Sequence, residues 1–282
     1  SESYEITGAL YLGYKMAQAW AVLLLMLAVV QWEGADAELA DQPEWIACAA
    51  APEACTTLEV YSRVIAGTIP SEIGLFTNLE RLSLYNAQVN GSIPKEIGNL
   101  QKLTLFNVHN NYISGKIPSE MGNMTSLVHF YAYSNFLSGR LPSELGLLPA
   151  LEALFLSKNF IRGTIPTTYG NLTKLYQFSL HRNNLTGPVP SELAMLSQLN
   201  VFFLSKNQLS GSIPPEVIET MNTQVKRWSF CHNDDMEFQE LTMIDSGNKT
   251  LLCAYDSTSG TEQQRRHLLR SDGAPRHVSA HA

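Results

Sequence analysis

The sequence has little of what a catalytic site needs in a short motif. It contains no Gly-x-Ser-x-Gly, His-Glu-x-x-His, Gly-x-x-x-x-Gly-Lys or Cys-x-x-Cys segment, so none of the nucleophile, zinc or phosphate sites that these motifs build is indicated. Its 4 cysteines are not accompanied by a second Cys or His pair at zinc-ligand spacing. We therefore expect a protein that is not an enzyme and that uses no cofactor or metal.

Positive charge and long hydrophobic runs are also scarce. The net charge of −7 gives no reason to expect a nucleic-acid partner. The main apolar run lies within residues 17–30 and is too short for a membrane span of about 20 residues. It fits the core of a signal peptide, with Ala35-Asp36-Ala37 as a cleavage site. An uncleaved anchor or a buried helix are the alternatives, and we expect membrane contact only if residues 17–30 are an uncleaved anchor.

What the sequence has instead is a phrase of 24 residues that returns in register. One copy runs from Leu151 to Pro166 and reads Leu-x-x-Leu-x-Leu-x-x-Asn-x-Ile-x-Gly-x-Ile-Pro. Its Gly corner recurs without insertion at Gly67, Gly91, Gly115, Gly139, Gly163, Gly187 and Gly211. A fixed period in the twenties with this pattern predicts a solenoid of stacked coils, because one coil cannot bury its own apolar side.

Within each coil the pattern predicts where the side chains point. Leu151, Leu154, Leu156, Ile161 and Ile165 should face the core, and the Leu-x-Leu segment should form a short strand that pairs in parallel with the next coil. We predict strands near residues 82–84, 106–108, 130–132, 154–156, 178–180, 202–204 and 228–230. Asparagine amides should satisfy buried backbone groups along a structural ladder at Asn111, Asn135, Asn159, Asn183, Asn207 and Asn233, which Ala87 interrupts.

The form Ser92-Ile-Pro-Lys-Glu-Ile-Gly-Asn-Leu100 resembles the plant-type subfamily of leucine-rich repeats. That subfamily includes receptor-kinase ectodomains and polygalacturonase-inhibiting proteins, and the resemblance covers about residues 45–255. It implies an α/β solenoid, a right-handed leucine-rich-repeat superhelix with a parallel concave sheet. It also implies a secreted or cell-surface location and a role in recognition.

The resemblance also suggests how the ends of the solenoid are covered. Plant-type N-terminal caps have a Trp followed by a cysteine pair, as Trp45, Cys48 and Cys55 do here. A disulfide between these cysteines is expected in an oxidising compartment, and two buried thiols are the alternative. After Pro214 the period lengthens by two residues, and residues 225–233 still read as the strand and ladder of a last coil. We expect the C-terminal cap to pair Cys231 with Cys253.

These features divide the chain into five parts. Residues 1–37 are an N-terminal extension with the signal peptide or anchor, 38–57 an N-terminal cap and 58–222 the repeats. Residues 223–255 are the last repeat and the C-terminal cap, and 256–282 read as a disordered tail. Sequons predict glycosylation at Asn90, Asn123, Asn171, Asn184 and Asn248.

Strand alternation locates a candidate binding surface, because side chains between and after the strand leucines point away from the core. Aromatic and histidine side chains gather there over adjacent coils, and cations occupy the C-terminal half. Exposed aromatic clusters of this kind favour binding, and the histidines favour acid sensitivity. The candidate ligand-binding residues are Tyr85, His109, His129, Tyr131, Tyr133, Phe155, Lys158, His181, Arg182, Phe203 and Lys206.

The sequence therefore predicts a secreted or cell-surface binding module that recognises a protein, a peptide or a cell-wall glycan through its concave face. Two other classes stay open. One is an inhibitor of a secreted hydrolase such as polygalacturonase. The other is a structural or ice-binding surface protein, for which flat Thr columns are expected, although Thr repeats in no column.

Overall fold

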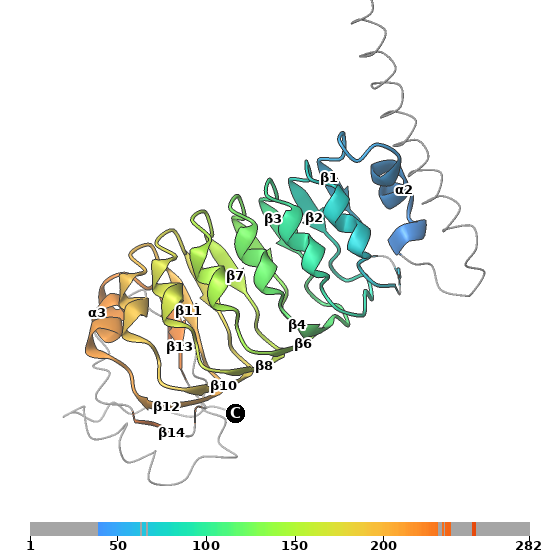
Figure 1. The fold of residues 1–282 in the computed structure, drawn as a ribbon. Helices are drawn as coiled ribbons and strands as arrows, with labels where there is room; N and C mark the ends of the chain where they lie inside the picture. The colour runs from blue at the N-terminus through green and yellow to red at the C-terminus, as the bar shows by residue number, and fades with distance from the viewer. Residues whose placement is uncertain are drawn as a thin grey trace, which may run out of the picture.

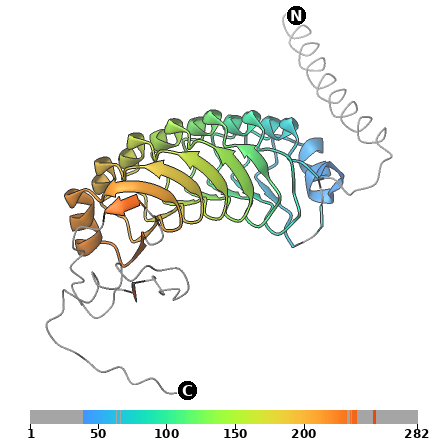
Figure 2. The same ribbon diagram turned by 90° about the horizontal axis from the view of Figure 1, so that it is seen from below.

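The computed structural model describes residues 39–62, 64–65, 67–230, 233, 235–237 and 250–251. They form a stack of coils bent into an arc, with helix α2 (Pro43–Ala50) at one end and helix α3 (Pro215–Thr223) at the other (Figure 1). A sheet lines the inner side of the arc and short helices line the outer side (Figure 2). The predicted solenoid with a parallel concave sheet is confirmed.

The inner sheet is built from the Leu-x-Leu segments. In the described part of the chain it has nine parallel strands, and partners through the regular coils lie 24 residues apart, as Leu82 and Phe106 do. The strands in spatial order are β1 (Thr57–Glu59), β2 (Arg81–Ser83), β3 (Leu105–Asn107), β5 (His129–Tyr131), β7 (Ala153–Phe155), β9 (Gln177–Ser179), β11 (Val201–Phe203), β13 (Arg227–Ser229) and β15 (Thr250–Leu251).

Each predicted strand of this sheet begins and ends one residue earlier than expected. The last expected residue of a strand, such as Leu156, still donates its N–H to the next coil, at 2.9 Å from Ser179 O. Its carbonyl, however, accepts from Asn159 Nδ2 at 3.0 Å. The chain therefore turns out of the sheet at this leucine, because an asparagine side chain replaces the backbone partner.

The asparagines form a ladder through the interior. Asn159 Oδ1 accepts the Leu137 N–H at 2.9 Å, and Asn159 Nδ2 donates to the carbonyls of Ala132 and Leu156 at 2.9 and 3.0 Å. Ala87 has no amide to offer, so the next rung, Asn111, compensates.

Asn111 Oδ1 accepts two N–H groups, from Ala87 and Val89, each at 3.0 Å. The backbone supplies the missing acceptor on the other side, because Ile65 N donates to Ala87 O at 2.9 Å. An interrupted rung is thus bridged by its two neighbours.

A second parallel sheet runs along one flank, which the sequence analysis did not predict (Figure 1). In the described residues its strands are β4 (Ser114–Lys116), β6 (Phe136–Gly139), β8 (Phe160–Gly163), β10 (Asn184–Gly187), β12 (Gln208–Ser212) and β14 (Asp235–Glu237). Partners here lie 22 residues apart through the regular coils, as Ser138 and Phe160 do. The corner glycine has the positive φ predicted for it, +80° at Gly163, and a Cβ there would lie 3.0 Å from Arg140 Cγ.

Short 3-10 helices cover the convex side. They are η2 (Ser71–Leu75), η3 (Lys95–Asn99), η4 (Ser119–Asn123), η5 (Ser143–Leu147), η6 (Thr167–Asn171) and η7 (Ser191–Met195), and each follows a proline whose fixed φ suits a helix start. In the next coil α3 takes their place with nine residues instead of five. This longer helix accommodates the two extra residues of the last period.

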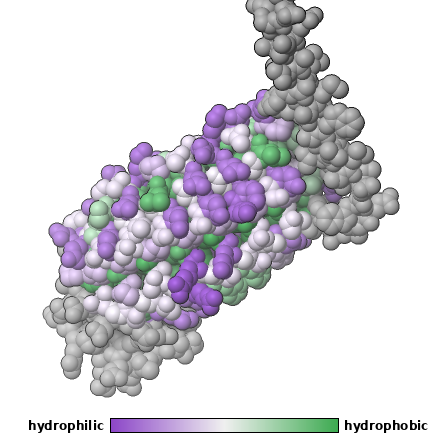
Figure 3. All heavy atoms as spheres, in the orientation of Figure 1, coloured by the Kyte–Doolittle hydropathy of each residue, from purple (hydrophilic) through white to green (hydrophobic). Residues whose placement is uncertain are grey.

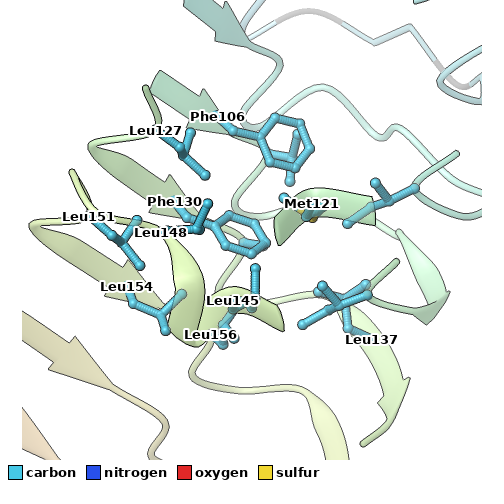
Figure 4. Packing of buried hydrophobic residues seen from close by; sticks show 14 of the residues in the cluster. Phe106, Met121, Leu127, Phe130, Leu137, Leu145, Leu148, Leu151, Leu154 and Leu156 are labelled. Carbon is cyan, nitrogen blue, oxygen red and sulfur yellow. The ribbon is translucent and has the colours of Figure 1, made fainter. Parts of the chain in front are cut away.

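Apolar side chains from both sides fill the space between the sheets and the helices. Phe106 and Phe130 from the inner strands meet Met121 from η4 and Leu145 from η5 (Figure 4). All four are fully buried. Each such side chain contributes roughly 1.5–3 kcal/mol by leaving water.

At the N-terminal end, η1 (Leu39–Asp41) and α2 cover the open core. Trp45 of α2 packs on Phe76 with ring centroids 5.0 Å apart. A disulfide joins Cys48 to Cys55. The predicted pair Cys231–Cys253, the sequon at Asn248 and the segments 1–37 and 256–282 lie outside the described residues.

Within the described ranges, no helix is both long enough and apolar enough to cross a membrane. The same residues include no group of three His, Cys, Asp or Glu side chains placed to hold a metal ion.

Candidate functional site

The open face of the inner sheet carries the side chains that alternate with the core leucines. The smaller members of its columns are buried between neighbours, as Ser83 and Ser179 are. The larger ones stand half-exposed. The strands thereby present an aromatic N-terminal half and a cationic C-terminal half, which we describe in turn.

The dominant feature of the N-terminal half is a stack of four rings, one from each of four successive coils: Tyr61, Tyr85, His109 and Tyr133. We call it the ring ladder. Neighbouring centroids are 4.9, 4.8 and 4.4 Å apart, and the planes are within 4–12° of parallel. The sequence analysis named three of these residues and missed Tyr61. Its place exactly one period before Tyr85 could have revealed it, but the first coil departs too far from the consensus to have been aligned.

The geometry of the ring ladder decides which part of each ring a ligand can touch. Two parallel rings with centres less than 5 Å apart cannot lie side by side without clashing, so they overlap face to face. The faces of Tyr85 and His109 are therefore covered by their neighbours. What the ladder offers to solvent is a row of ring edges and polar ring atoms.

His109 has a defined hydrogen-bonding role within the ladder. Its Nδ1 lies 2.6 Å from Asn107 Oδ1, and the backbone N–H of His109 points to the same oxygen at 3.5 Å. An amide oxygen only accepts, so Nδ1 carries the proton and Nε2 is an acceptor in the neutral ring. Burial lowers the pKa of His109, which favours this neutral form.

A second aromatic group adjoins the ladder. Tyr131 lies edge-on to Phe155 with centroids 5.5 Å apart, and His129 stacks on Tyr131 at 5.7 Å. Tyr133 belongs to both groups, because its ring also meets Phe155 edge-on at 6.4 Å. Burial raises the pKa of Tyr131, helped by the neighbouring Tyr133, and burial also raises the pKa of Tyr133. Both hydroxyls therefore remain donors at neutral pH.

The C-terminal half of the face is cationic. Lys158, Arg182 and Lys206 occupy the same place in three successive coils, each exposed and each with φ near +55° just before a ladder asparagine. They surround His181, whose Nδ1 lies 2.9 Å from Ser179 Oγ. Burial, followed by these three cations, lowers the pKa of His181.

Most predicted site residues thus fall into two adjoining groups, and one stands apart. Phe203 pairs with the guanidinium of Arg227, which lies 5.8 Å from its ring centroid, and with His181 edge-on at 6.2 Å. Arg227 was not named from the sequence, because the two-residue insertion shifts its column. The described sequons are exposed: Asn123 and Asn171 end helices on the convex side, and Asn90 and Asn184 lie at the second sheet.

Comparison with known proteins agrees with this architecture. The family model Leucine Rich Repeat matches residues 78–100 and 102–124. No curated protein matches the chain. Among solved structures, the plant peptide hormone receptor RGFR1, in complex with RGF2, is 33% identical over 64% of this chain and 31% of its own, with a TM-score of 0.60.

Two further receptors are similar to the same degree. The Arabidopsis receptor kinase HAESA, in complex with the peptide hormone IDA and the co-receptor SERK1, is 31% identical over 65% of this chain and 30% of its own, with a TM-score of 0.60. A TDR receptor is 30% identical over 62% and 30%, with a TM-score of 0.59. The chain thus spans about three tenths of each of these receptor chains. It is a leucine-rich-repeat protein of the plant type that resembles the ectodomains of plant receptor kinases.

Proposed function

We propose that the chain is an extracellular recognition module that binds a linear peptide, in extended conformation, along its concave sheet. The observation that carries this proposal is the ring ladder of Tyr61, Tyr85, His109 and Tyr133, which lies half-exposed on the open face. Parallel sheets normally bury both faces, so large aromatics on an open one favour a binding role. The similar receptors RGFR1 and HAESA were solved with peptide hormones bound, which supports the same ligand class.

The covered ring faces favour a peptide over a cell-wall glycan. Sugars stack on the face of an aromatic ring, whereas the inner rings of the ladder expose edges. A row of edges with a phenol or imidazole atom at each step suits a chain that brings an apolar side chain or a backbone group to each position. The ladder has three steps of 4.4–4.9 Å. That length holds roughly four residues of extended peptide at about 3.3 Å each.

The polar groups of the site supply orientation. Neutral His109 presents Nε2 as an acceptor for a peptide N–H, and the hydroxyls of Tyr131 and Tyr133 can donate to carbonyls. Lys158, Arg182 and Lys206 favour an acidic side chain or a terminal carboxylate at the C-terminal half of the sheet. The disulfide Cys48–Cys55 is consistent with a secreted or cell-surface location.

The test is selection from a display library of random linear 12-residue peptides on the wild-type chain, run beside an array of cell-wall oligosaccharides. Selected peptides are then measured on two variants. Tyr85→Ala with Tyr133→Ala removes two rungs of the ladder, and Tyr176→Ala removes an equally exposed tyrosine outside it as the matched control.

We expect binding to fall at least about 30-fold in the ladder variant, because hot-spot aromatics cost about 2 kcal/mol or more on truncation. The control should bind as the wild type does. Enrichment of oligosaccharides without enrichment of peptides would reject the peptide assignment. Loss of binding in the control alone would reject the site.

A further inference from the structure

The second sheet carries an aromatic row of its own, on the flank and away from the concave face. Tyr112, Phe136 and Phe160 follow the ladder asparagines of three successive coils, and they are 54%, 47% and 55% exposed. Their ring centroids are 6.1 and 5.9 Å apart. We call them the lateral row. None contributes to the buried core.

The lateral row differs from the other large apolar side chains that reach solvent. Leu75, Leu147 and Met195 share one place in the repeat on the convex side, but at least one coil without an apolar residue there separates each from the next. Isolated apolar residues are normal on a surface. Three aromatics in contact over adjacent coils are not, since soluble proteins keep contiguous apolar patches small unless they bind something.

Cations flank the lateral row on the same sheet. Lys116, Arg140 and Arg162 line a shallow hollow beside it. None of the three forms an ion pair or a side-chain hydrogen bond with any residue in the described ranges. In Figure 3 hydrophilic side chains gather where β6 and β8 lie in Figure 1. These charges are available to a partner.

The stems of these cations are held in place by the corner glycines. A Cβ at Gly139 would lie 2.8 Å from Lys116 Cγ, and one at Gly163 would lie 3.0 Å from Arg140 Cγ. Each long side chain therefore lies across the next coil. Carboxylates are present in the same hollow, but Ser119 Oγ and Ser143 Oγ each donate to one, at 3.2 and 3.1 Å.

Between the aromatics and the cations lies a flat strip of small residues. Ser114 Oγ donates to Gly91 O at 3.1 Å and Ser138 Oγ donates to Gly115 O at 3.3 Å, so both hydroxyls are occupied within the sheet. The strip lets another surface approach closely. It also sets the apolar and the charged contacts side by side, about one strand residue pair apart.

We propose that this flank, formed by the lateral row and the three cations, is a docking surface for a second protein. The contact segment of that protein presents an aromatic or aliphatic side chain flanked by carboxylates. Charge complementarity to Lys116, Arg140 and Arg162 fixes the acidic part, and the lateral row fixes the apolar part. The exposed sequon Asn184 pairs with Arg162, so a glycan there would end the surface at the next coil.

The experiment uses synthetic nine-residue peptides with a central Trp flanked by Glu, and a matched set with Lys in place of Glu, in fluorescence anisotropy at about 50 and 300 mM NaCl. Phe136→Ser with Phe160→Ser removes the lateral row. Arg140→Glu with Arg162→Glu reverses the charge. Leu147→Ser with Met195→Ser is the control, because it removes equally exposed apolar area from the convex side.

We expect the Glu peptides to bind the wild type at least tenfold more tightly than the Lys peptides, and less tightly at high salt. Both lateral variants should lose this binding at least tenfold, while the control and the ladder variant Tyr85→Ala with Tyr133→Ala keep it. The last comparison separates this surface from the concave site. Thermal melting of each variant checks that it is folded.

Three results would overturn the proposal. Equal binding of the Glu and Lys peptides would remove the role of the cations. Self-association of the wild-type chain in sedimentation velocity that disappears in Phe136→Ser with Phe160→Ser would make a second copy the occupant. Salt-insensitive binding of an oligosaccharide that depends on Phe136 would make a glycan the occupant.

Discussion

The interrupted asparagine ladder gives an unequal cost for removing two of its rungs. In Asn159→Ala each main-chain partner but one keeps another donor. Ala132 O still accepts from Asn135 Nδ2 at 3.2 Å, and Leu156 O still accepts from Asn183 Nδ2 at 3.0 Å. Only the Leu137 N–H loses its sole partner.

Asn111→Ala removes more, because Ala87 cannot share the load. The N–H groups of Ala87 and Val89 both lose Asn111 Oδ1, and Leu84 O loses Asn111 Nδ2 at 2.7 Å with no second amide to replace it. Three buried groups are orphaned instead of one. At about 1–3 kcal/mol for each orphaned group, Asn111→Ala should cost about two to three times as much as Asn159→Ala.

The assay is denaturant unfolding of the deglycosylated chain, with the free energy taken from midpoints at constant slope. Asn184→Ala is the matched control, because this asparagine is exposed one residue beyond the ladder and should change stability by less than about 0.5 kcal/mol. Equal losses for Asn111→Ala and Asn159→Ala would refute the reasoning. So would a loss in the control as large as that of either rung.

Two further predictions concern acid and the glycines. Burial lowers the pKa of His109 and His181 below the usual 6.5, so the unfolded chain takes up these protons first and stability should fall as the pH drops below 6.5. The variant His109→Asn with His181→Asn should lose less stability between about pH 7 and pH 5 than the wild type does; an equal loss would contradict this. Gly98→Ala should destabilise more than Gly211→Ala in thermal melts, because its Cβ would lie 2.4 Å from Glu120 O, whereas Gly211 has only a positive φ of +75° to oppose the change. The opposite order would show that backbone conformation, and not the close approach of the coils, limits these positions.

The repeat pattern predicted the fold because each coil restates the same physical requirement. Apolar residues at Leu151, Leu154 and Leu156 have no other way to leave water than against the next coil, and the interior amide at Asn159 has no other partners than buried backbone. The same alternation grouped the aromatic residues of the concave face. It did not predict ring stacking, because that depends on side-chain rotation that no pattern records.

The second sheet and the lateral row were missed for a different reason. Three- to five-residue strands that contain a glycine or serine have weak strand propensity, and only the stacking of coils makes them pair. Tyr112, Phe136 and Phe160 do recur with the 24-residue period. The periodic signal was read for the leucines and the strand flanks, and the position after the ladder asparagine was not followed.

Hydroxyl-radical footprinting with a peptide obtained from the selection tests the central claim most directly. The ring ladder and the rest of the surface both carry exposed tyrosines, so they report within one experiment. The account predicts that saturating peptide slows oxidation of Tyr61, Tyr85 and Tyr133, while Tyr112 and Tyr176 react as before. Protection of Tyr112 or Tyr176 with unchanged oxidation of the three ladder tyrosines would contradict it.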